Sequence, residues 1–151
     1  MLARLLILLF ITYTPFVMAV ELDPITEETG CYPEDGAGEF GWNLSDKEGN
    51  KECVFAQFPS GKPENPYVIV KGKKVLLTSV SVKKIKSGWW QEERVFANRA
   101  KKITARLKSR LSKDSCIGND GSCCGQEYGG RLEVSNGDSK KVYEVTRWSG
   151  A

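Results

Sequence analysis

Short runs of β-branched and aromatic residues, separated at close intervals by turn residues, constrain the fold of this chain more than any other feature. Gly72 and the pair Asn136-Gly137 each stand between two such runs, where a tight β-hairpin needs residues that tolerate a positive φ. This pattern is typical of antiparallel sandwiches and small barrels. The sequence therefore predicts a mainly β fold, a single small antiparallel sandwich or barrel, with strands at 53–58, 67–70, 75–82, 131–134 and 141–146.

Residues 91–111 fit two patterns. As a helix, the segment would carry one apolar stripe, formed by Phe96, Ala100, Ile103, Leu107 and Leu111. As a strand, residues 102–111 alternate between apolar or small side chains and polar or cationic ones. Because predicted strands lie on both sides, we expect a strand at 102–111 and a shorter one at 94–96. The alternative is an α+β fold with one helix near 91–111.

Residues 1–19 have the three parts of a secretory signal peptide. Arg4 precedes the apolar run Leu5–Ile11, and Val17 and Ala19 are small residues at the positions that signal peptidase reads. The run is shorter than the roughly 18 residues that a membrane-spanning helix needs. We therefore expect cleavage before Val20.

After that cleavage, residues 20–151 have the length of one domain. We expect a single exported β-rich domain, secreted or periplasmic, with no transmembrane segment in the mature chain. The segment 20–30 precedes the first cysteine and is rich in acidic residues, so we expect it to be poorly ordered.

Five cysteines follow the predicted cleavage point, and they are Cys31, Cys53, Cys116, Cys123 and Cys124. Cysteines at this density in an oxidising compartment are normally paired. We expect Cys31 to pair with Cys53, and Cys116 to pair with either Cys123 or Cys124. The expected fold is thus disulfide-stapled, with one thiol left over.

Charge is unevenly distributed along the chain. Residues 66–113 contain 14 basic and 2 acidic residues, whereas residues 20–65 contain 3 basic and 11 acidic ones. A strand at 102–111 would place the basic residues of that strand on one face, near two tryptophans. The candidate anion-binding residues are Lys102, Arg106, Lys108, Arg110, Trp89 and Trp90. The alternative is that these cations only solvate an exposed sheet face.

The chain contains no histidine, which removes Ser-His-Asp and Cys-His catalysis and imidazole metal sites. The cysteine spacing lacks the close pairs of a thiolate zinc site. We therefore predict no catalytic residue, no metal and no cofactor. A small hydrolase based on paired carboxylates stays as an alternative, because acidic residues distant in sequence can meet in space.

These features favour an exported, non-enzymatic binding protein. Its expected partner is another exported protein, to which it would bind as an inhibitor or immunity-type protein through rigid loops in 31–53 and 116–124. The second hypothesis is an adaptor that binds anionic envelope components, either lipid headgroups or acidic polysaccharide, through the basic face. No nucleic-acid partner is expected for an exported chain.

Overall fold

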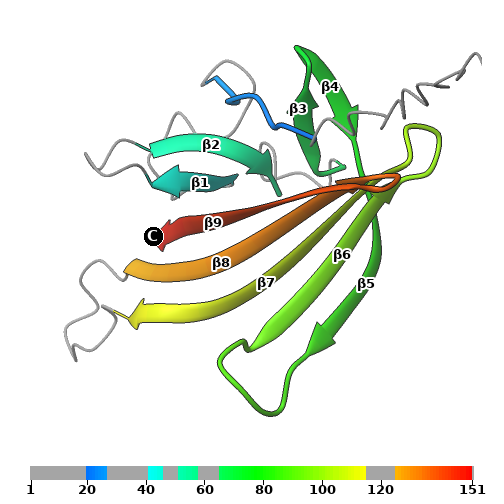
Figure 1. The fold of residues 1–151 in the computed structure, drawn as a ribbon. Helices are drawn as coiled ribbons and strands as arrows, with labels where there is room; N and C mark the ends of the chain where they lie inside the picture. The colour runs from blue at the N-terminus through cyan, green and yellow to red at the C-terminus, as the bar shows by residue number, and fades with distance from the viewer. Residues whose placement is uncertain (1–19, 27–40, 46–50, 58–64, 115–124, 151) are drawn as a thin grey trace, which may run out of the picture.

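The computed structural model describes residues 20–26, 41–45, 51–57, 65–114 and 125–150. These residues form one antiparallel sheet in the order β4-β3-β2-β1-β9-β8-β7-β6-β5 (Figure 1). The strands are β1 (Gly41–Ser45), β2 (Lys51–Ala56), β3 (Tyr67–Val70), β4 (Lys73–Leu76), β5 (Thr78–Lys84), β6 (Glu92–Asn98), β7 (Ile103–Asp114), β8 (Gly125–Asn136) and β9 (Ser139–Gly150).

The sheet curls into a nearly closed, barrel-like shape. Its two edge strands, β4 and β5, are joined in the chain by Leu77 alone. Phe55 of β2 meets Phe96 of β6 edge-to-face, with 5.2 Å between ring centroids, although these strands are far apart in the sheet order. Strong curvature brings the two strands face to face across the interior. The predicted mainly β, antiparallel fold is confirmed in the form of a curved sheet.

The expected single strand at 75–82 is wrong, because the chain turns at Leu77. The Leu77 side chain is fully buried and its N–H donates to the carbonyl of Pro66 at 2.7 Å. Residues before it belong to β4 and residues after it to β5, at opposite edges of the sheet. A continuous β-branched run therefore hides a corner that only the packing of Leu77 reveals.

The helix considered near 91–111 does not form. Residues 92–98 and 103–114 are the neighbouring strands β6 and β7, paired from Glu92↔Ser109 to Asn98↔Ile103. On β7 the side chains of Ile103, Ala105 and Leu107 are buried, and those between them are not. The alternation thus decides the structure here, since a period of two gives the sheet one buried face.

The two predicted hairpins are confirmed. Gly72 and Gly137 both adopt a positive φ, at 68° and 59°, in the turns that join β3 to β4 and β8 to β9. Strands β8 and β9 are longer than the expected strands at 131–134 and 141–146, and β8 begins at Gly125. The last strand also pairs with β1 through Asn43↔Thr146 and Leu44↔Val145.

One half of the concave inner face is packed with apolar side chains, and we call it the apolar half. It joins strands from both sides of the curl and contains Phe55, Phe96, Ile103, Ala105, Leu107, Leu132, Val134, Tyr143 and Val145. Interior-facing residues alternate with exterior ones along each strand of a small barrel, and side chains fill the interior. The apolar half is therefore the main core of the described fold.

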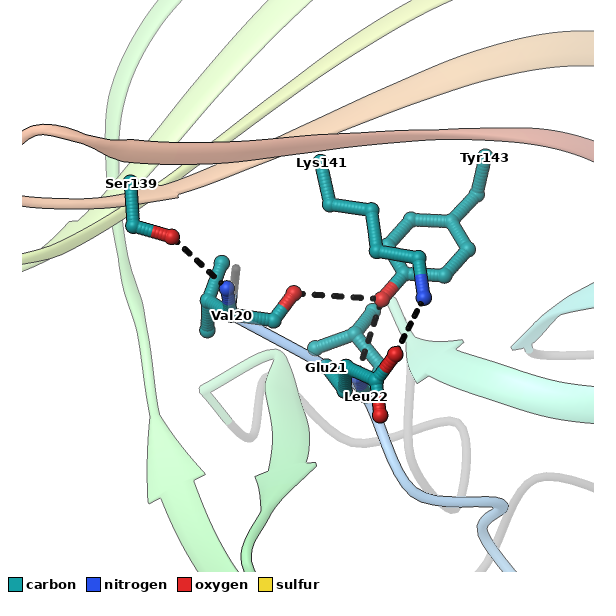
Figure 2. Close-up of polar contacts among 6 residues, drawn as sticks. All are labelled: Val20, Glu21, Leu22, Ser139, Lys141 and Tyr143. Carbon is teal, nitrogen blue, oxygen red and sulfur yellow. Dashed lines mark hydrogen bonds and ion pairs between the residues drawn. The ribbon is translucent and has the colours of Figure 1, made fainter. Parts of the chain in front are cut away.

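Residues 20–26, which we call the N-terminal segment, complete this core. Val20 and Leu22 are buried in it, and Ile25 is buried in a smaller neighbouring cluster with Cys53 and Tyr67. In Figure 2 the Val20 N–H donates to Ser139 Oγ at 2.8 Å, and the Leu22 N–H donates to the Tyr143 hydroxyl at 2.9 Å. We expected the segment 20–30 to be poorly ordered. The structure shows residues 20–26 bonded to β9, and residues 27–30 lie outside the described residues.

The same segment also bonds to strands β2 and β3. The Asp23 N–H donates to the carbonyl of Ile69 at 2.9 Å, and Asp23 Oδ2 accepts from the Gly72 N–H at 2.6 Å. The Ile25 N–H donates to the carbonyl of Cys53 at 2.6 Å. These seven residues thereby connect β9, on one side of β1, to β2 and β3, on its other side.

Cys53 is buried on β2. Cys31, Cys116, Cys123 and Cys124 lie outside the described residues, so the expected disulfide pairing stays a prediction. Within the described ranges, no helix is long and apolar enough to cross a membrane.

Candidate functional site

The inner face of the sheet changes character partway along its strands. On β6, Phe96 is buried, and the same face continues with Arg94 and Glu92. On β9, Val145 is buried, and the same face continues with Arg147. Because alternate residues of a strand share a face, these charged side chains lie beside the core rather than on the outside of the sheet.

These charged residues line a cavity of about 330 Å³, which we call the inner pocket. Its described lining comes from both sides of the curl, and it comprises Trp42, Gln57, Lys84, Gln91, Glu92, Arg94, Leu107, Ser109, Arg110, Tyr128 and Arg147. Four of these residues are cations and one is a carboxylate. The pocket therefore has an excess of positive charge in a concave site, where field lines are focused.

Arg147 contacts three other residues of this lining. Its guanidinium carbon is 5.4 Å from the centroid of the Trp42 ring and 4.9 Å from that of the Tyr128 ring. Its Nη1 donates to Gln57 Oε1 at 3.5 Å, and the same oxygen accepts from Trp42 Nε1 at 2.6 Å. Two aromatic faces and an amide thus hold the cation in place, by cation–π attraction and hydrogen bonding.

The position of Trp42 depends on Gly130 of β8. A Cβ atom at Gly130 would come within 2.6 Å of Trp42 Cζ3 and within 3.1 Å of Val145 Cγ2. The absence of a side chain lets the indole lie flat against the sheet, at 2 % exposure. Gly130 therefore shapes the boundary between the apolar half and the inner pocket.

Arg94 forms an ion pair with Glu92 through its Nε. Each side chain remains roughly a quarter exposed, at 29 % and 26 %. Glu92 is the one carboxylate in the described lining, and this pair partly offsets one of the four cations. Lys84, Arg110 and Arg147 supply the rest of the positive charge.

The structure separates the anion-binding residues expected from the sequence. Lys102 lies in the turn before β7, with a φ of 54°. Arg106, Lys108 and Trp90 line a smaller cavity of about 180 Å³ on the outer face, together with Arg131 and Glu133. We call this the outer pocket.

The outer face around this pocket carries both signs of charge. Lys108 Nζ lies 3.6 Å from Glu93 Oε2, and Lys140 Nζ lies 2.7 Å from Glu133 Oε2. Arg106 stands opposite Glu133 in the β7–β8 register. Much of the positive charge expected on this face is therefore balanced by neighbouring strands.

Arg110 and Trp89 come together elsewhere. Arg110 follows the last β6–β7 pair, Glu92↔Ser109, and its guanidinium carbon stacks 3.4 Å from the centroid of the Trp89 ring. Arg110 lines the inner pocket, while Trp89 is 66 % exposed. The sequence placed Arg110 beside Arg106 and Lys108, but the structure brings it to the inner pocket.

Trp42, Tyr128 and Arg147 were not among the site residues that we predicted from the sequence. One signal was present: in Tyr143-x-Val145-x-Arg147, a cation continues an alternating apolar face. The pattern could not show that this face meets Trp42, since the pairing of β9 with β1 joins residues about a hundred positions apart.

Comparisons of the chain with protein-family models, curated proteins and solved structures found no match. Among the described residues, no group of three or more histidine, cysteine, aspartate or glutamate side chains is placed to hold a metal ion. A function for this chain is therefore inferred from the geometry of the inner pocket.

Proposed function

We propose that this chain is an exported, non-enzymatic binding protein whose ligand site is the inner pocket. The observation that carries the proposal is the change along the inner face from a packed core to a cavity lined by cations and aromatic rings. Ligand sites in proteins are concave, largely preformed, and often lie in the mouths of β-barrels. The volume of the inner pocket is at the lower end of the range for such sites, about 300 to 1,000 Å³.

The lining supports binding more than hydrolysis. A glycosidase needs two carboxyl groups in the site, one as acid and the other as base or nucleophile. The described lining contributes only Glu92, and that carboxylate is ion-paired with Arg94. A binding site needs no such pair.

The N-terminal segment supports the proposal of export. Cleavage before Val20 would turn its amide nitrogen into the α-amino group of the mature chain. That nitrogen already lies 2.8 Å from Ser139 Oγ, which can accept a hydrogen bond from either form. The predicted mature chain would thus begin at a residue whose backbone nitrogen is already bonded to the sheet.

For the test, the whole chain is expressed with its native signal peptide, and the exported protein is purified from the compartment that it reaches. Mass spectrometry should find Val20 as the first residue. A library of small neutral and charged compounds, each added at millimolar concentration, should contain members that raise the melting temperature of the purified protein.

Pocket-filling variants locate those hits. Ser109→Leu and Gln91→Phe should each remove the shifts, because both side chains line the inner pocket. Thr104→Leu, on the opposite face of β7, is the matched control and should keep them. Hits that persist in both pocket variants, or a library without hits, would overturn the assignment of the site.

A protein partner is the second candidate function, and a different observation favours it. Strand β5 is an edge strand that pairs only with β6 in the described sheet, and all seven of its side chains are exposed. Val80 and Val82 are 60 % and 56 % exposed. Exposed edges with apolar side chains can pair with a strand of another protein.

Capture from the native compartment tests this candidate. Wild-type protein should retain a stoichiometric partner, and a Val80→Lys, Val82→Lys double variant should lose it, because charge on an edge strand opposes strand pairing. A partner retained equally by the double variant would exclude the β5 edge. The loops in 31–53 and 116–124 that we expected to bind a partner lie largely outside the described residues.

A further inference from the structure

The charges in the inner pocket restrict its ligand further than its shape does. Arg147 on β9, Arg94 on β6 and Lys84 on β5 come from three different strands and line the same cavity. Guanidinium groups present pairs of N–H donors whose spacing matches the two oxygens of a carboxylate, sulfate or phosphate. A concave arrangement of such groups selects an anion over a cation or a neutral ligand.

The interior below the pocket limits the size of the ligand. Leu107 lines the pocket and is 1 % exposed, and the inner face beyond it is filled by Leu132 and Val145. Close-packed interiors leave few voids larger than a water molecule. A long acyl chain therefore has no space beyond the pocket, and the ligand must be compact.

The aromatic residues are held in defined positions. Trp42 donates to Gln57, and the Tyr128 hydroxyl donates to Gln126 Oε1 at 2.7 Å. Side chains that are fixed before binding lower the entropic cost of association. They also give the pocket apolar wall area, against which a ring can pack once its charged group meets the cations.

We propose that the inner pocket binds a compact organic oxyanion, a carboxylate, sulfate or phosphate group carried on a single small ring. This inference rests on the proposed function, because it uses the same pocket. The ring can be aromatic, or it can be the sugar of an acidic saccharide. These two sources share the anionic group and differ in the ring, so the probes distinguish them.

The experiment is calorimetric titration of the full-length exported protein with matched probes. Benzoate and glucuronate are the two ring-bearing anions, benzyl alcohol and glucose are their neutral analogues, and inorganic phosphate is the anion without a ring. At least one ring-bearing anion should bind ten times or more tightly than its neutral analogue and than phosphate. Its affinity should fall as salt is added, because the attraction is screened.

Charge-removing variants identify the residues. Arg147→Gln should weaken binding of the tighter probe at least tenfold. Because Arg147 is packed between aromatic rings, Lys84→Gln, at an exposed position, is a second variant that tests the pocket without disturbing the core, and it should weaken binding about threefold. Lys101→Gln removes the same charge from the exposed β6–β7 turn, beside the apolar half, and should leave affinity within twofold of wild type.

Two results would overturn the inference. Neutral analogues that bind as tightly as the anions would show a pocket without anion selectivity, and the proposed function would survive. Loss of binding in Arg106→Gln with no loss in Lys84→Gln would move the anion site to the outer pocket. If no compound of either charge binds and the library test also fails, the proposed function falls as well.

Discussion

The apolar half and the inner pocket occupy the same inner face of one curved sheet, yet they differ in almost every physical respect. In the apolar half, side chains from opposite strands interdigitate and the N-terminal segment adds Val20 and Leu22. In the inner pocket, the same strands present Arg94, Ser109 and Arg147 around a cavity. Packed apolar side chains fill the first half, whereas charged and polar side chains surround a cavity of about 330 Å³ in the second. The side chains that the strands carry, rather than the backbone of the sheet, therefore separate core from cavity.

The comparison predicts that stability depends on the apolar half. Leu132→Ala should lower the free energy of unfolding by about 3 kcal/mol, because it removes a fully buried side chain and leaves a cavity. Ser109→Ala, on the neighbouring strand in the inner pocket, should change it by less than about 0.5 kcal/mol. Denaturant unfolding measures both values, and equal costs would mean that the two halves do not differ in this way.

Gly130 tests the boundary between the two halves. Gly130→Ala should cost about 2 kcal/mol, because the new Cβ overlaps the Trp42 ring and forces it to shift. The same shift should alter tryptophan fluorescence and weaken ligand binding in the inner pocket. Gly129→Ala, whose Cβ would meet no atom within 4 Å, is the control and should preserve the fluorescence. An unchanged spectrum in Gly130→Ala would mean that Trp42 does not depend on this glycine.

Tyr143 tests the attachment of the N-terminal segment. Its hydroxyl accepts from the Leu22 N–H and donates to the carbonyl of Val20 at 3.3 Å. Tyr143→Phe should therefore cost about 1.5 kcal/mol, since a buried N–H loses its acceptor. Tyr128→Phe should cost less, because the hydroxyl of this inner-pocket residue makes a partly buried hydrogen bond to Gln126. Thermal unfolding of the pair ranks them, and the reverse order would contradict the role given to the N-terminal segment.

The smallest expected effect concerns Glu21 and Lys141, whose Oε1 and Nζ atoms are 2.8 Å apart. A dashed line joins the two side chains in Figure 2. The hydrogen bond to Glu21 raises the pKa of Lys141 above its usual 10.5. A raised pKa in the folded state contributes stability below the unfolded value, and this contribution is lost as the pH rises through the folded one. Glu21 is largely exposed and Lys141 is about one third exposed. Solvent screens such a pair, so Glu21→Gln should cost at most about 0.5 kcal/mol at neutral pH.

Stability curves from pH 7 to 11.5 check the sign of this effect. The difference between wild type and Glu21→Gln should be constant near neutrality and shrink above pH 10.5. A difference that grows with pH would contradict the assigned pair.

The anion-binding prediction shows where sequence reasoning reaches its limit. Alternation correctly predicted a strand over most of 102–111, with Arg106 and Lys108 on one face, but the strand begins at Ile103 and Lys102 lies in the turn before it. Alternation cannot report what the neighbouring strands contribute, and there the structure adds Glu93 and Glu133. Alternation also cannot show that Arg110 lines the inner pocket, since the β7–β8 register continues unbroken from Arg106 through Arg110.

Local pattern was enough for most of the strands and for the turns at Gly72 and Asn136-Gly137, because a period of two and a positive φ are properties of a few consecutive residues. It missed β1, and it joined the end of β4 to β5. Tertiary structure decided the corner at Leu77, the seat of Val20 against Ser139, and the meeting of Trp42 with Arg147. Each of these depends on which distant strands lie side by side once the sheet curls. The inner pocket forms only when the sheet curls, since its walls come from strands as far apart in the sheet order as β1 and β5.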